Sequence, residues 1–383
     1  MDRFIEQLPF FTSEHRNLAT SVAGFVQFEV EPRAADERDA DHRTREYVNL
    51  LAAAGMLHYA VPGPLVPLDV RALCLIREAL AYSSALADSA FVMQGLGTYA
   101  IAQAAPDHVR DFWVSRAAEG KAIAAFALTE PEAGSDVAAI QTTAQRDGDT
   151  YVINGNKRFI SNAGIADFYT VFARTSTRDD RRAQLSTFVV GSKMAGISVV
   201  ERTALIAPHP IGEIKFEDCR VPAENIVGTE GDGFRLAMQT LDVFRSSVGA
   251  AACGMAHRAL DEAVRYASSR KQFGRLLAEH QLIQEKLADM VTELDAARLL
   301  VYRAAYLKDS GADRITREAS EAKLFATEAA SRIVDQAVQI HGAAGLVRGS
   351  VVERLYRDVR ALRIYEGTSE IQKLVIASQL LKE

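Results

Sequence analysis

The stretch TYVINGNKRFI, residues 150–160, decides the fold class, because it opens a series of strands in a chain that otherwise shows helical periodicity. Its Asn154-Gly155 pair lies between two β-prone runs, a pattern that predicts a hairpin turn. Further segments rich in β-branched and aromatic residues follow it: DFYTVFARTS (167–176), LSTFVVGS (185–192), GISVVER (196–202) and EIKFEDCRVP (213–222). Strands that follow one another without intervening helices predict an antiparallel sheet or barrel.

Helical periodicity precedes this strand-rich zone. Apolar residues recur at helical spacing in three segments: SEHRNLATSVAGFVQFEV (13–30), TREYVNLLAAAG (44–55) and DVRALCLIREALAYSSALADSAFVM (69–93). Ser13 and Thr44 are the candidate N-caps, and PGPLVP (62–67) is expected to break the helical zone near its middle.

Longer helices follow the strands. Apolar residues recur at helical spacing within 282–305 and 320–340, and DSGADR (309–314) and GAAGLVRGS (342–350) are the clearest breaks. Four long helices with short connections predict an antiparallel bundle. The chain is therefore expected to be α+β with three domains: an N-terminal α-helical domain (1–120), a middle β-barrel domain (121–227) and a C-terminal four-helix-bundle domain (228–383).

The composition disfavours several classes of function. The chain has 383 residues and a net charge of −6, so no basic excess is available to neutralise the phosphates of a nucleic acid. Its three cysteines, Cys74, Cys219 and Cys253, are far apart and odd in number, which predicts a reducing compartment and no metal site.

No membrane or export segment is expected. The N-terminal MDRFIEQLPFF mixes acidic residues with apolar ones, and no apolar run reaches the roughly 18 residues that span a bilayer. The sequence therefore predicts a cytoplasmic protein. It also lacks the glycine-rich fingerprint of a Rossmann fold, a phosphate loop, a His-Glu-x-x-His motif and a Gly-x-Ser-x-Gly motif.

A glutamate in the stretch RIYEGTSEIQ (363–372) is a candidate base. A lone charged residue between helices is usually a solvated loop residue. Here Ser369 and Gln372 fit a capping box, which predicts that the last helix starts at Ser369. Glu366 then lies in the connection, after apolar Ile364 and Tyr365, and such surroundings are expected to raise its pKa toward that of a useful base.

The stretch FALTEPEAGSD (126–136) is a candidate binding segment. Thr129, Gly134 and Ser135 place hydroxyl groups and accessible backbone amides close together, and such groups suit a phosphate or the edge of a flavin. An ordinary polar turn is the alternative.

Four motifs in this order resemble those of the acyl-CoA dehydrogenase family: FALTEPEAGSD (126–136), RKQFGRLLAEHQ (270–281), QIHGAAG (339–345) and YEGTSEIQ (365–372). The resemblance extends from about residue 10 to 380. It implies a homotetramer, built as a dimer of dimers, that binds FAD and catalyses α,β-dehydrogenation of an acyl-CoA to the trans-2-enoyl-CoA. Electrons would then pass to an electron-transfer flavoprotein.

The resemblance also implies which residues bind FAD. Within one subunit the matching positions are Phe126, Leu128, Thr129, Gly134, Ser135, Phe159, Ile160, Ser161, Thr368, Ser369 and Glu370. Positions that match contacts with a neighbouring subunit's FAD are Arg270, Gln272, His280, Gln281, Gln339, Ile340, His341, Gly342 and Ala343. Phe159 and Ser161 stand where relatives carry Trp and Thr, and Glu370 replaces an amide.

By the same resemblance Glu366 is the catalytic base that removes the α-proton. Some branches of the family place the base just before an arginine of the first bundle helix, but this chain has Phe244 before Arg245 there. The matching substrate-side positions are Ser135, Asp242, Phe244, Arg245, Tyr365 and Gly367. For Asp242 and Arg245 a surface ion pair is the alternative, and Phe244 would either narrow the acyl cavity or turn into the bundle core.

One segment departs from the family pattern. Pro208-His209-Pro210 replaces an Arg-Ser-Thr-rich run of many relatives, so a carrier-protein thioester is an alternative to acyl-CoA. An oxidase or monooxygenase that uses oxygen is a second alternative on the same fold. A flavin-containing nucleic-acid-binding relative is a third, which the acidic balance and Glu366 disfavour.

Overall fold

The computed structural model describes residues 3–63, 68–176 and 180–382, and its contacts divide the chain into two units. The helical unit comprises Met1–Asp36, Asp69–Asp88 and Asp242–Glu383, and the sheet unit comprises Glu37–Leu68 and Ser89–Leu241. Part of the predicted break at 62–67, residues 64–67, lies outside the described residues.

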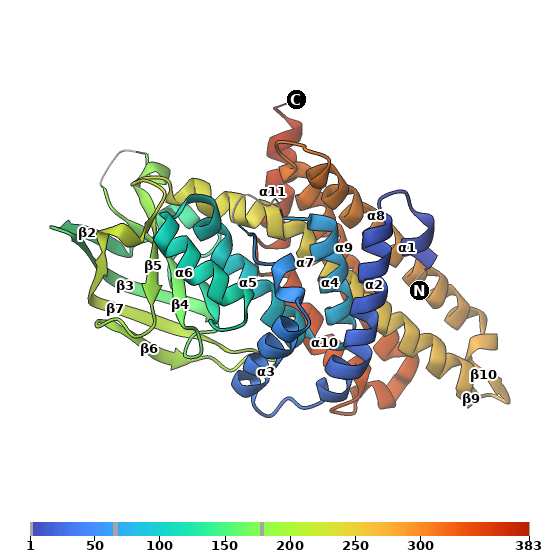
Figure 1. Ribbon diagram of the computed structural model, residues 1–383. Coiled ribbons are helices and arrows are strands. Elements are labelled where there is room, and N and C mark those ends of the chain that lie inside the picture. The colour runs from blue at the N-terminus through green and yellow to red at the C-terminus, as the bar shows by residue number, and fades with distance from the viewer. Residues whose placement is uncertain (1–2, 64–67, 177–179, 383) are drawn as a thin grey trace. The chain divides into compact units, whose positions relative to one another are not determined.

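The helical unit is built from long α-helices joined by short turns (Figure 1). Its elements are α1 (Arg3–Gln7), α2 (Ser13–Phe25), α4 (Val70–Ser83), α8 (Gln281–Asp309), α9 (Thr316–His341), α10 (Val351–Val359) and α11 (Ser369–Leu380), with the start of α5 (Ala85–Ala104) and most of α7 (Gly233–Ser269). The short hairpin of β9 (Lys271–Gln272) and β10 (Arg275–Leu276) lies between α7 and α8 in the chain. The long C-terminal helices expected from the periodicity are confirmed.

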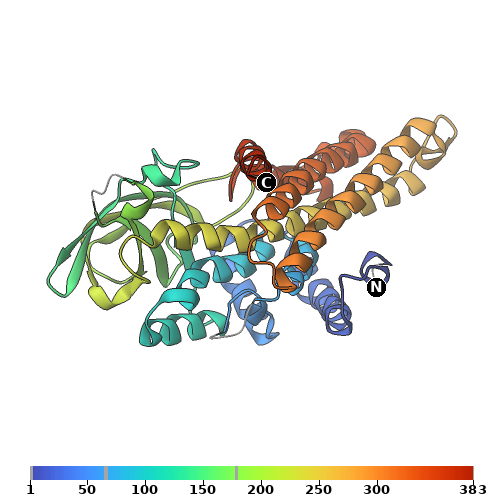
Figure 2. The same cartoon turned by 90° about the horizontal axis from the view of Figure 1, so that it is seen from above.

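Small residues bring the helices of this unit close together. Helices α8 and α9 lie side by side (Figure 2). A Cβ atom at Gly249 of α7 would lie 2.7 Å from Cγ2 of Val301 on α8, and one at Gly254 would overlap the carbonyl of Glu78 on α4. Only glycine allows α7 to approach both neighbours at these points.

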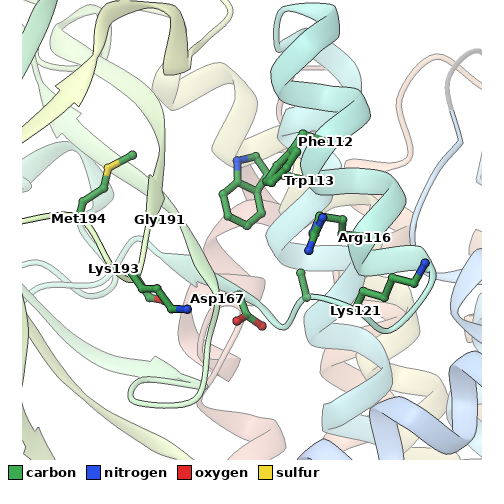
Figure 3. Close-up of a pocket in the computed structure, with 10 residues that line it drawn as sticks. Phe112, Trp113, Arg116, Lys121, Asp167, Gly191, Lys193 and Met194 are labelled. Atoms are coloured by element: carbon green, nitrogen blue, oxygen red, sulfur yellow. The ribbon is translucent and has the colours of Figure 1, made fainter.

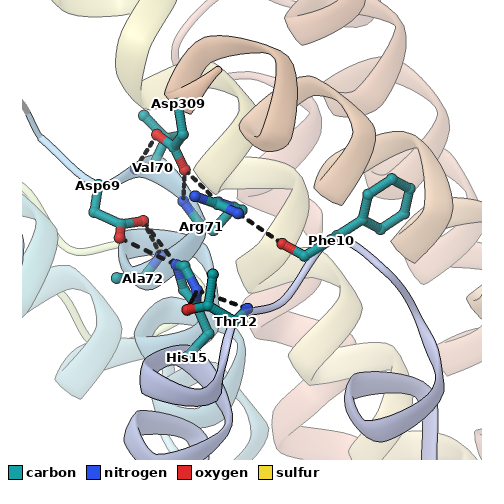
Figure 4. A network of polar contacts seen from close by, with 8 residues as sticks. All are labelled: Phe10, Thr12, His15, Asp69, Val70, Arg71, Ala72 and Asp309. Carbon is teal, nitrogen blue, oxygen red and sulfur yellow. Dashed lines mark hydrogen bonds and ion pairs between the residues drawn. The ribbon is translucent and has the colours of Figure 1, made fainter. Parts of the chain in front are cut away.

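Polar contacts fasten the start of α4 inside the same unit (Figure 4). Asp309, at the end of α8, accepts hydrogen bonds from the Val70 backbone N–H at 2.8 Å and from Arg71 Nε at 2.7 Å. Asp69 accepts from the Ala72 N–H and contacts His15 Nε2 at 3.1 Å. Although burial opposes it, these hydrogen bonds lower the pKa of Asp69 to about 2.

The predicted N-caps are wrong by one or several residues. Helix α2 does begin at Ser13, but its N-cap is Thr12. Helix α3 (Ala40–Ala53) begins before Thr44, because the Asp39 carboxylate accepts a hydrogen bond from the His42 N–H at 3.0 Å and so caps the first turn. In each case a polar residue that stands earlier in the chain occupies the cap position.

The sheet unit contains one eight-stranded sheet with helices from the first half of the chain. Its strands are β1 (Ala124–Ala127), β2 (Thr143–Asp147), β3 (Thr150–Ser161), β4 (Phe168–Arg174), β5 (Leu185–Gly191), β6 (Ile197–Arg202), β7 (Ile211–Pro222) and β8 (Ile226–Val227). Its helices are α3, most of α5, and α6 (Asp107–Ala118).

The strand order is β6-β7-β3-β2-β4-β5-β8, with β1 paired to β4. Most neighbours are antiparallel as expected, whereas β1 and β4 are parallel and β2 meets β4 in a single parallel pair. Among the described residues no pairing joins β6 to β8, so the hydrogen bonds form an open path between these two edges.

The hairpin predicted at Asn154-Gly155 is wrong. Strand β3 runs straight through these residues, with a register shift against β7, and the turn lies earlier, at Gly148 between β2 and β3. Gly155 has a φ of +144°, and a Cβ atom there would lie 2.6 Å from the Thr142 hydroxyl. Gly155 is required because the strand bulges here and because Thr142 packs closely against its backbone. A glycine required for these reasons has the same local sequence pattern as one in a hairpin turn.

Within the described residues, no helix is long and apolar enough to cross a membrane.

Candidate active site

Glu366 lies in the short connection that precedes α11, as the sequence predicted. Its backbone φ is +52°, in the left-handed region that side-chain-bearing residues seldom adopt. Such a conformation costs about 1–3 kcal/mol and persists only where surrounding contacts impose it. Gly367 follows with a φ of +95°, so two consecutive residues turn the chain sharply at the start of α11.

The Glu366 carboxylate is partly without hydrogen-bonding partners. Its Oε2 atom is inaccessible to solvent, and no described residue bonds to it. Burial raises the pKa of Glu366, and the positive charges of Arg77, Lys323 and Arg245 only partly oppose that effect. The predicted direction is therefore confirmed.

Among the three cations, Arg77 lowers the pKa of Glu366 the most. It lies on α4, is 1% exposed, and forms a two-point ion pair with Asp88 of α5, with both nitrogen–oxygen distances 2.7 Å. A third hydrogen bond, from Nη1 to the Ser247 hydroxyl, is 2.9 Å long. These three hydrogen bonds fix a buried cation near Glu366, and none of them goes to the base.

Lys323 is the second cation, and it shapes the connection itself. Its ammonium group donates to the carbonyl of Gly367 at 2.7 Å, and burial lowers its pKa to about 8. Gln372 Nε2 donates to the same carbonyl at 2.9 Å and to that of Glu366 at 3.2 Å. Gln372 therefore braces the turn and does not close a capping box with Ser369. Helix α11 begins at Ser369 as predicted, but the predicted capping box is wrong, because the N-cap is Thr368, which accepts the Ile371 N–H at 3.3 Å.

Arg245 is the third cation. It is 6% exposed and pairs with Asp242 at 2.7 Å, so the ion pair exists but is not the surface pair considered as the alternative. Its Nε atom is buried without a hydrogen-bonding partner among the described residues. Phe244 beside it is fully buried.

Removal of one of these three cations should change the pH at which Glu366 becomes active as a base. We expect Lys323→Met to shift the acid limb of the pH–rate profile to higher pH, because a positive charge that favours ionised Glu366 is lost. A base acts only when deprotonated, so activity is lost as the pH falls through its pKa. Arg303→Met, which removes an exposed cation, is the control. An unchanged profile in Lys323→Met would contradict this account of the site.

In the sheet unit, the two segments expected to border a flavin lie next to each other. The Arg158 N–H donates to the Thr129 carbonyl at 2.9 Å, so the segment that follows β1 runs beside β3. Lys157, fully buried, donates to the Leu128 carbonyl at 3.1 Å and to Glu130 at 2.8 Å. This buried ion pair holds the segment in place.

Side chains in these two segments differ in accessibility. Phe159 has a φ of +54° and is 50% exposed, whereas Ile160 is buried in the core of the sheet unit, where only its backbone remains for a ligand. Ser161 bonds to His209 Nε2 at 2.7 Å. Gly134 and Ser135 are exposed, and Phe126 packs on Phe172.

Residues expected to reach a neighbouring subunit also come together, within the helical unit. Arg270 and Gln272 are exposed at the β9–β10 hairpin, and His280 Nε2 lies 3.2 Å from the Gln272 carbonyl. His341, at the end of α9, stacks on Tyr266, whose carbonyl accepts the Arg270 N–H. Of the neighbours of His341, Gln339, Gly342 and Ala343 are exposed and Ile340 is buried, while Gln281, after His280, is exposed.

These donors fit a flavin dinucleotide. Arg270 offers an exposed guanidinium for an anionic pyrophosphate, and Ser135 and Thr129 supply hydroxyl groups beside accessible backbone. The hydroxyl of Ser369 fits less well, since Ser369 is buried and donates to Glu328 at 2.6 Å. Thr368 is used as a cap, and Glu370 is exposed.

Sequence reasoning missed Arg77, Asp88 and Lys323. A signal was present for both cations. Arg77 interrupts an almost wholly apolar run of α4, and Lys323 lies three residues before Ala326, inside the apolar stripe of α9. A lone charge on a buried helical face needs a partner, which a sequence does not identify.

Sequence profiles of one family match the chain in three consecutive parts. These are the N-terminal domain of acyl-CoA dehydrogenases over residues 12–121, the middle domain over 125–219, and the C-terminal domain over 231–381.

Individual proteins are similar over almost the whole length. The chain is 41% identical to the 3-(aryl)acrylate reductase of Clostridium sporogenes, over 97% of this chain and 100% of that protein. It is 37% identical to the cyclohexane-1-carbonyl-CoA dehydrogenase of Geobacter metallireducens, over 98% and 99%. The structure of butyryl-CoA dehydrogenase from Megasphaera elsdenii matches with a TM-score of 0.90 at 34% identity, over 97% and 99%.

Proposed function

The chain belongs to the acyl-CoA dehydrogenase family, and we propose that it oxidises an acyl-CoA to the trans-2-enoyl-CoA with Glu366 as the base. The observation that carries this proposal is the buried Oε2 atom of Glu366, which has no partner among the described residues in a site that raises its pKa. FAD is the cofactor of the family, and when bound it accepts the hydride from the β-carbon.

The residues around Glu366 support removal of a proton next to a thioester. The free Oε2 atom can accept the α-proton, and the positive φ of the residue sets the direction in which its side chain leaves the backbone. No hydrogen bond within the described chain uses the Glu366 backbone N–H, so this group can donate to the thioester carbonyl as negative charge develops there. The positive charges of Arg77, Lys323 and Arg245 favour the ionised form of the base and partly oppose the effect of burial.

Anaerobic bleaching of the flavin across a panel of acyl-CoAs tests this function and the acyl group together. We expect butyryl-CoA, isobutyryl-CoA or a compact cyclic acyl-CoA to reduce the flavin faster than octanoyl- and palmitoyl-CoA. Tyr365 directly precedes the base, Phe244 precedes Arg245, whose charge acts on the base, and the similar Geobacter protein is named for a cyclic substrate. In Phe244→Ala, the rate of flavin reduction by octanoyl-CoA should then rise relative to the rate with butyryl-CoA. Palmitoyl-CoA as the best substrate would refute the size assignment alone, whereas no bleaching by any acyl-CoA would refute the function.

For the electron acceptor we propose an electron-transfer flavoprotein. Consumption of oxygen by the reduced enzyme without an added acceptor, at the rate of turnover, would favour the oxidase alternative.

Reduction of an enoyl thioester is a second candidate, because the relative from Clostridium sporogenes is a reductase. The raised pKa of Glu366 suits that direction too, since a protonated carboxyl can return the proton to the α-carbon. Faster steady-state conversion of crotonyl-CoA to butyryl-CoA with a supplied electron donor than of butyryl-CoA to crotonyl-CoA with an acceptor would favour this direction, and the reverse ratio would exclude it.

We further propose a homotetramer in which Arg270 and residues 339–343 contact FAD of a neighbouring subunit. Arg270→Ala should weaken FAD binding by about tenfold to a hundredfold, the value of a lost hydrogen bond to a charged group. It should also shift the assembly toward smaller species in sedimentation. Lys271→Ala, an exposed neighbour in the same hairpin, is the control. A monomeric Arg270→Ala protein with full FAD content would contradict the shared site.

A further inference from the structure

A cavity of about 350 Å³ lies within the sheet unit, in a part of the chain to which no role has been given above. Helix α6 and the turn after it form one wall, and the segment that follows β5 forms the other (Figure 3). A volume of this size is within the range of pockets that hold small molecules.

Packing and backbone hydrogen bonds hold both walls in place. Trp113 of α6 packs on Phe168 with ring centroids 4.6 Å apart. Asp167 accepts the Ile123 N–H through its carboxylate at 2.8 Å, and its own carbonyl accepts the Ser192 N–H at 2.9 Å. The cavity is therefore formed before any ligand arrives.

Two cations, Arg116 and Lys193, line the cavity together with one carboxylate, that of Asp167. Arg116 extends from α6 toward the strand that ends at Gly191, and Lys193 extends toward Asp167 from the opposite wall (Figure 3). Among the described residues neither cation forms an ion pair or a hydrogen bond from its side chain, although Arg116 stacks over Phe112. The third cation, Lys121, points away and pairs with Glu119 at 2.6 Å.

Trp113 forms an aromatic side of the cavity. Trp113 presents its indole next to Gly191, whose missing side chain leaves the ring uncovered by any Cβ atom. An aromatic surface beside unpaired cations favours a flat ring that carries a negative group, since the ring can stack while the anion is neutralised.

We propose that this cavity binds a small aromatic anion, a flat ring bearing one phosphate or carboxylate group, between Trp113, Arg116 and Lys193. Nucleoside monophosphates and aryl carboxylates share this chemistry. All residues of this site belong to the sheet unit, whereas Glu366 belongs to the helical unit.

Trp113 is the chain's single tryptophan, so its fluorescence reports on this cavity. The holoenzyme is titrated with AMP, benzoate, adenosine and inorganic phosphate, and the emission change is compared with the Kd from calorimetry. We expect AMP, benzoate or both to change the emission, and adenosine and phosphate to bind at least about tenfold more weakly. Binding of AMP alone identifies a mononucleotide site, and binding of benzoate alone identifies an aryl carboxylate site.

Variants assign any signal to named residues. Arg116→Ala and Lys193→Ala should each raise the Kd about tenfold, equivalent to the loss of one charge-assisted contact. Lys121→Ala, which removes the cation already paired with Glu119, should leave the Kd unchanged. The proposal is overturned if no probe changes the Trp113 emission, if phosphate or adenosine binds as tightly as AMP and benzoate, or if Arg116→Ala binds like the wild type. Loss of the signal on saturation with butyryl-CoA would overturn it too, because the probe would then occupy the acyl-CoA site.

Discussion

Glu366→Gln should slow reduction of the flavin by acyl-CoA by at least about 10²–10⁴, the usual contribution of a general base. The amide has almost the same shape, so FAD content and acyl-CoA binding should persist, but it cannot accept the α-proton. Stopped-flow bleaching measures the rate, and the shift of the flavin spectrum on addition of a non-oxidisable thioester measures binding. Glu217→Gln, at an exposed position of β7, is the matched control. Bleaching of the Glu366→Gln variant at a near-normal rate would place the base elsewhere.

The same variant should be more stable than the wild type at neutral pH. A carboxyl whose pKa is raised by folding stabilises the fold while it is protonated, and that contribution is lost as the pH rises through the raised pKa. Ionised Glu366 therefore costs stability at pH 7, and an amide that cannot ionise removes the cost. A higher Tm for Glu366→Gln at pH 7, with the difference shrinking at acidic pH, is the expected result.

Arg77→Met should lower the free energy of unfolding by about 3–5 kcal/mol, because the Asp88 carboxylate would remain buried without its partner. Removal of the largest charge that opposes the raised pKa of Glu366 should raise that pKa further, so any folded variant should lose activity at a higher pH than the wild type does. Denaturant unfolding and the pH–rate profile provide the two measurements.

A surface ion pair supplies the control for this effect. Arg332 pairs with Glu293 at 2.9 Å, but both side chains are substantially exposed, so Arg332→Met should cost no more than about 1 kcal/mol. Adding Asp88→Asn to Arg77→Met should restore part of the stability, because the buried unpaired charge disappears. Equal losses in Arg77→Met and Arg332→Met would show that burial of the first pair has no energetic consequence.

The sequence was sufficient for the order of helices and strands and for the position of Glu366. Long periodic segments such as 320–340 predict helices well, because one buried face repeats over several turns. The stretch at Asn154-Gly155 misled, since a glycine required by a close backbone approach has the same local signature as one required by a turn.

The electrostatic surroundings of the base could not be predicted in the same way. Arg77, Asp88, Arg245 and Lys323 come from four helices, and only the packing of those helices brings the charges to one place. Periodicity predicted the helices that carry these residues. It did not show which buried charges share a site or that the Oε2 atom of Glu366 is left without a partner among the described residues.

The glycine contacts of α7 also have an entropic consequence. Side chains that are fixed in a core lose rotamer freedom, whereas glycine has none to lose. Where Gly249 and Gly254 meet α8 and α4, the helices are held by backbone contact, and on the α7 side no rotamer can change to alter their spacing. Arg77 on α4 and Ser247 on α7 are joined by a hydrogen bond between the same two helices. The distances between the charges that act on Glu366 should therefore fluctuate little. The pKa of Glu366 should vary correspondingly little with thermal motion of the helices.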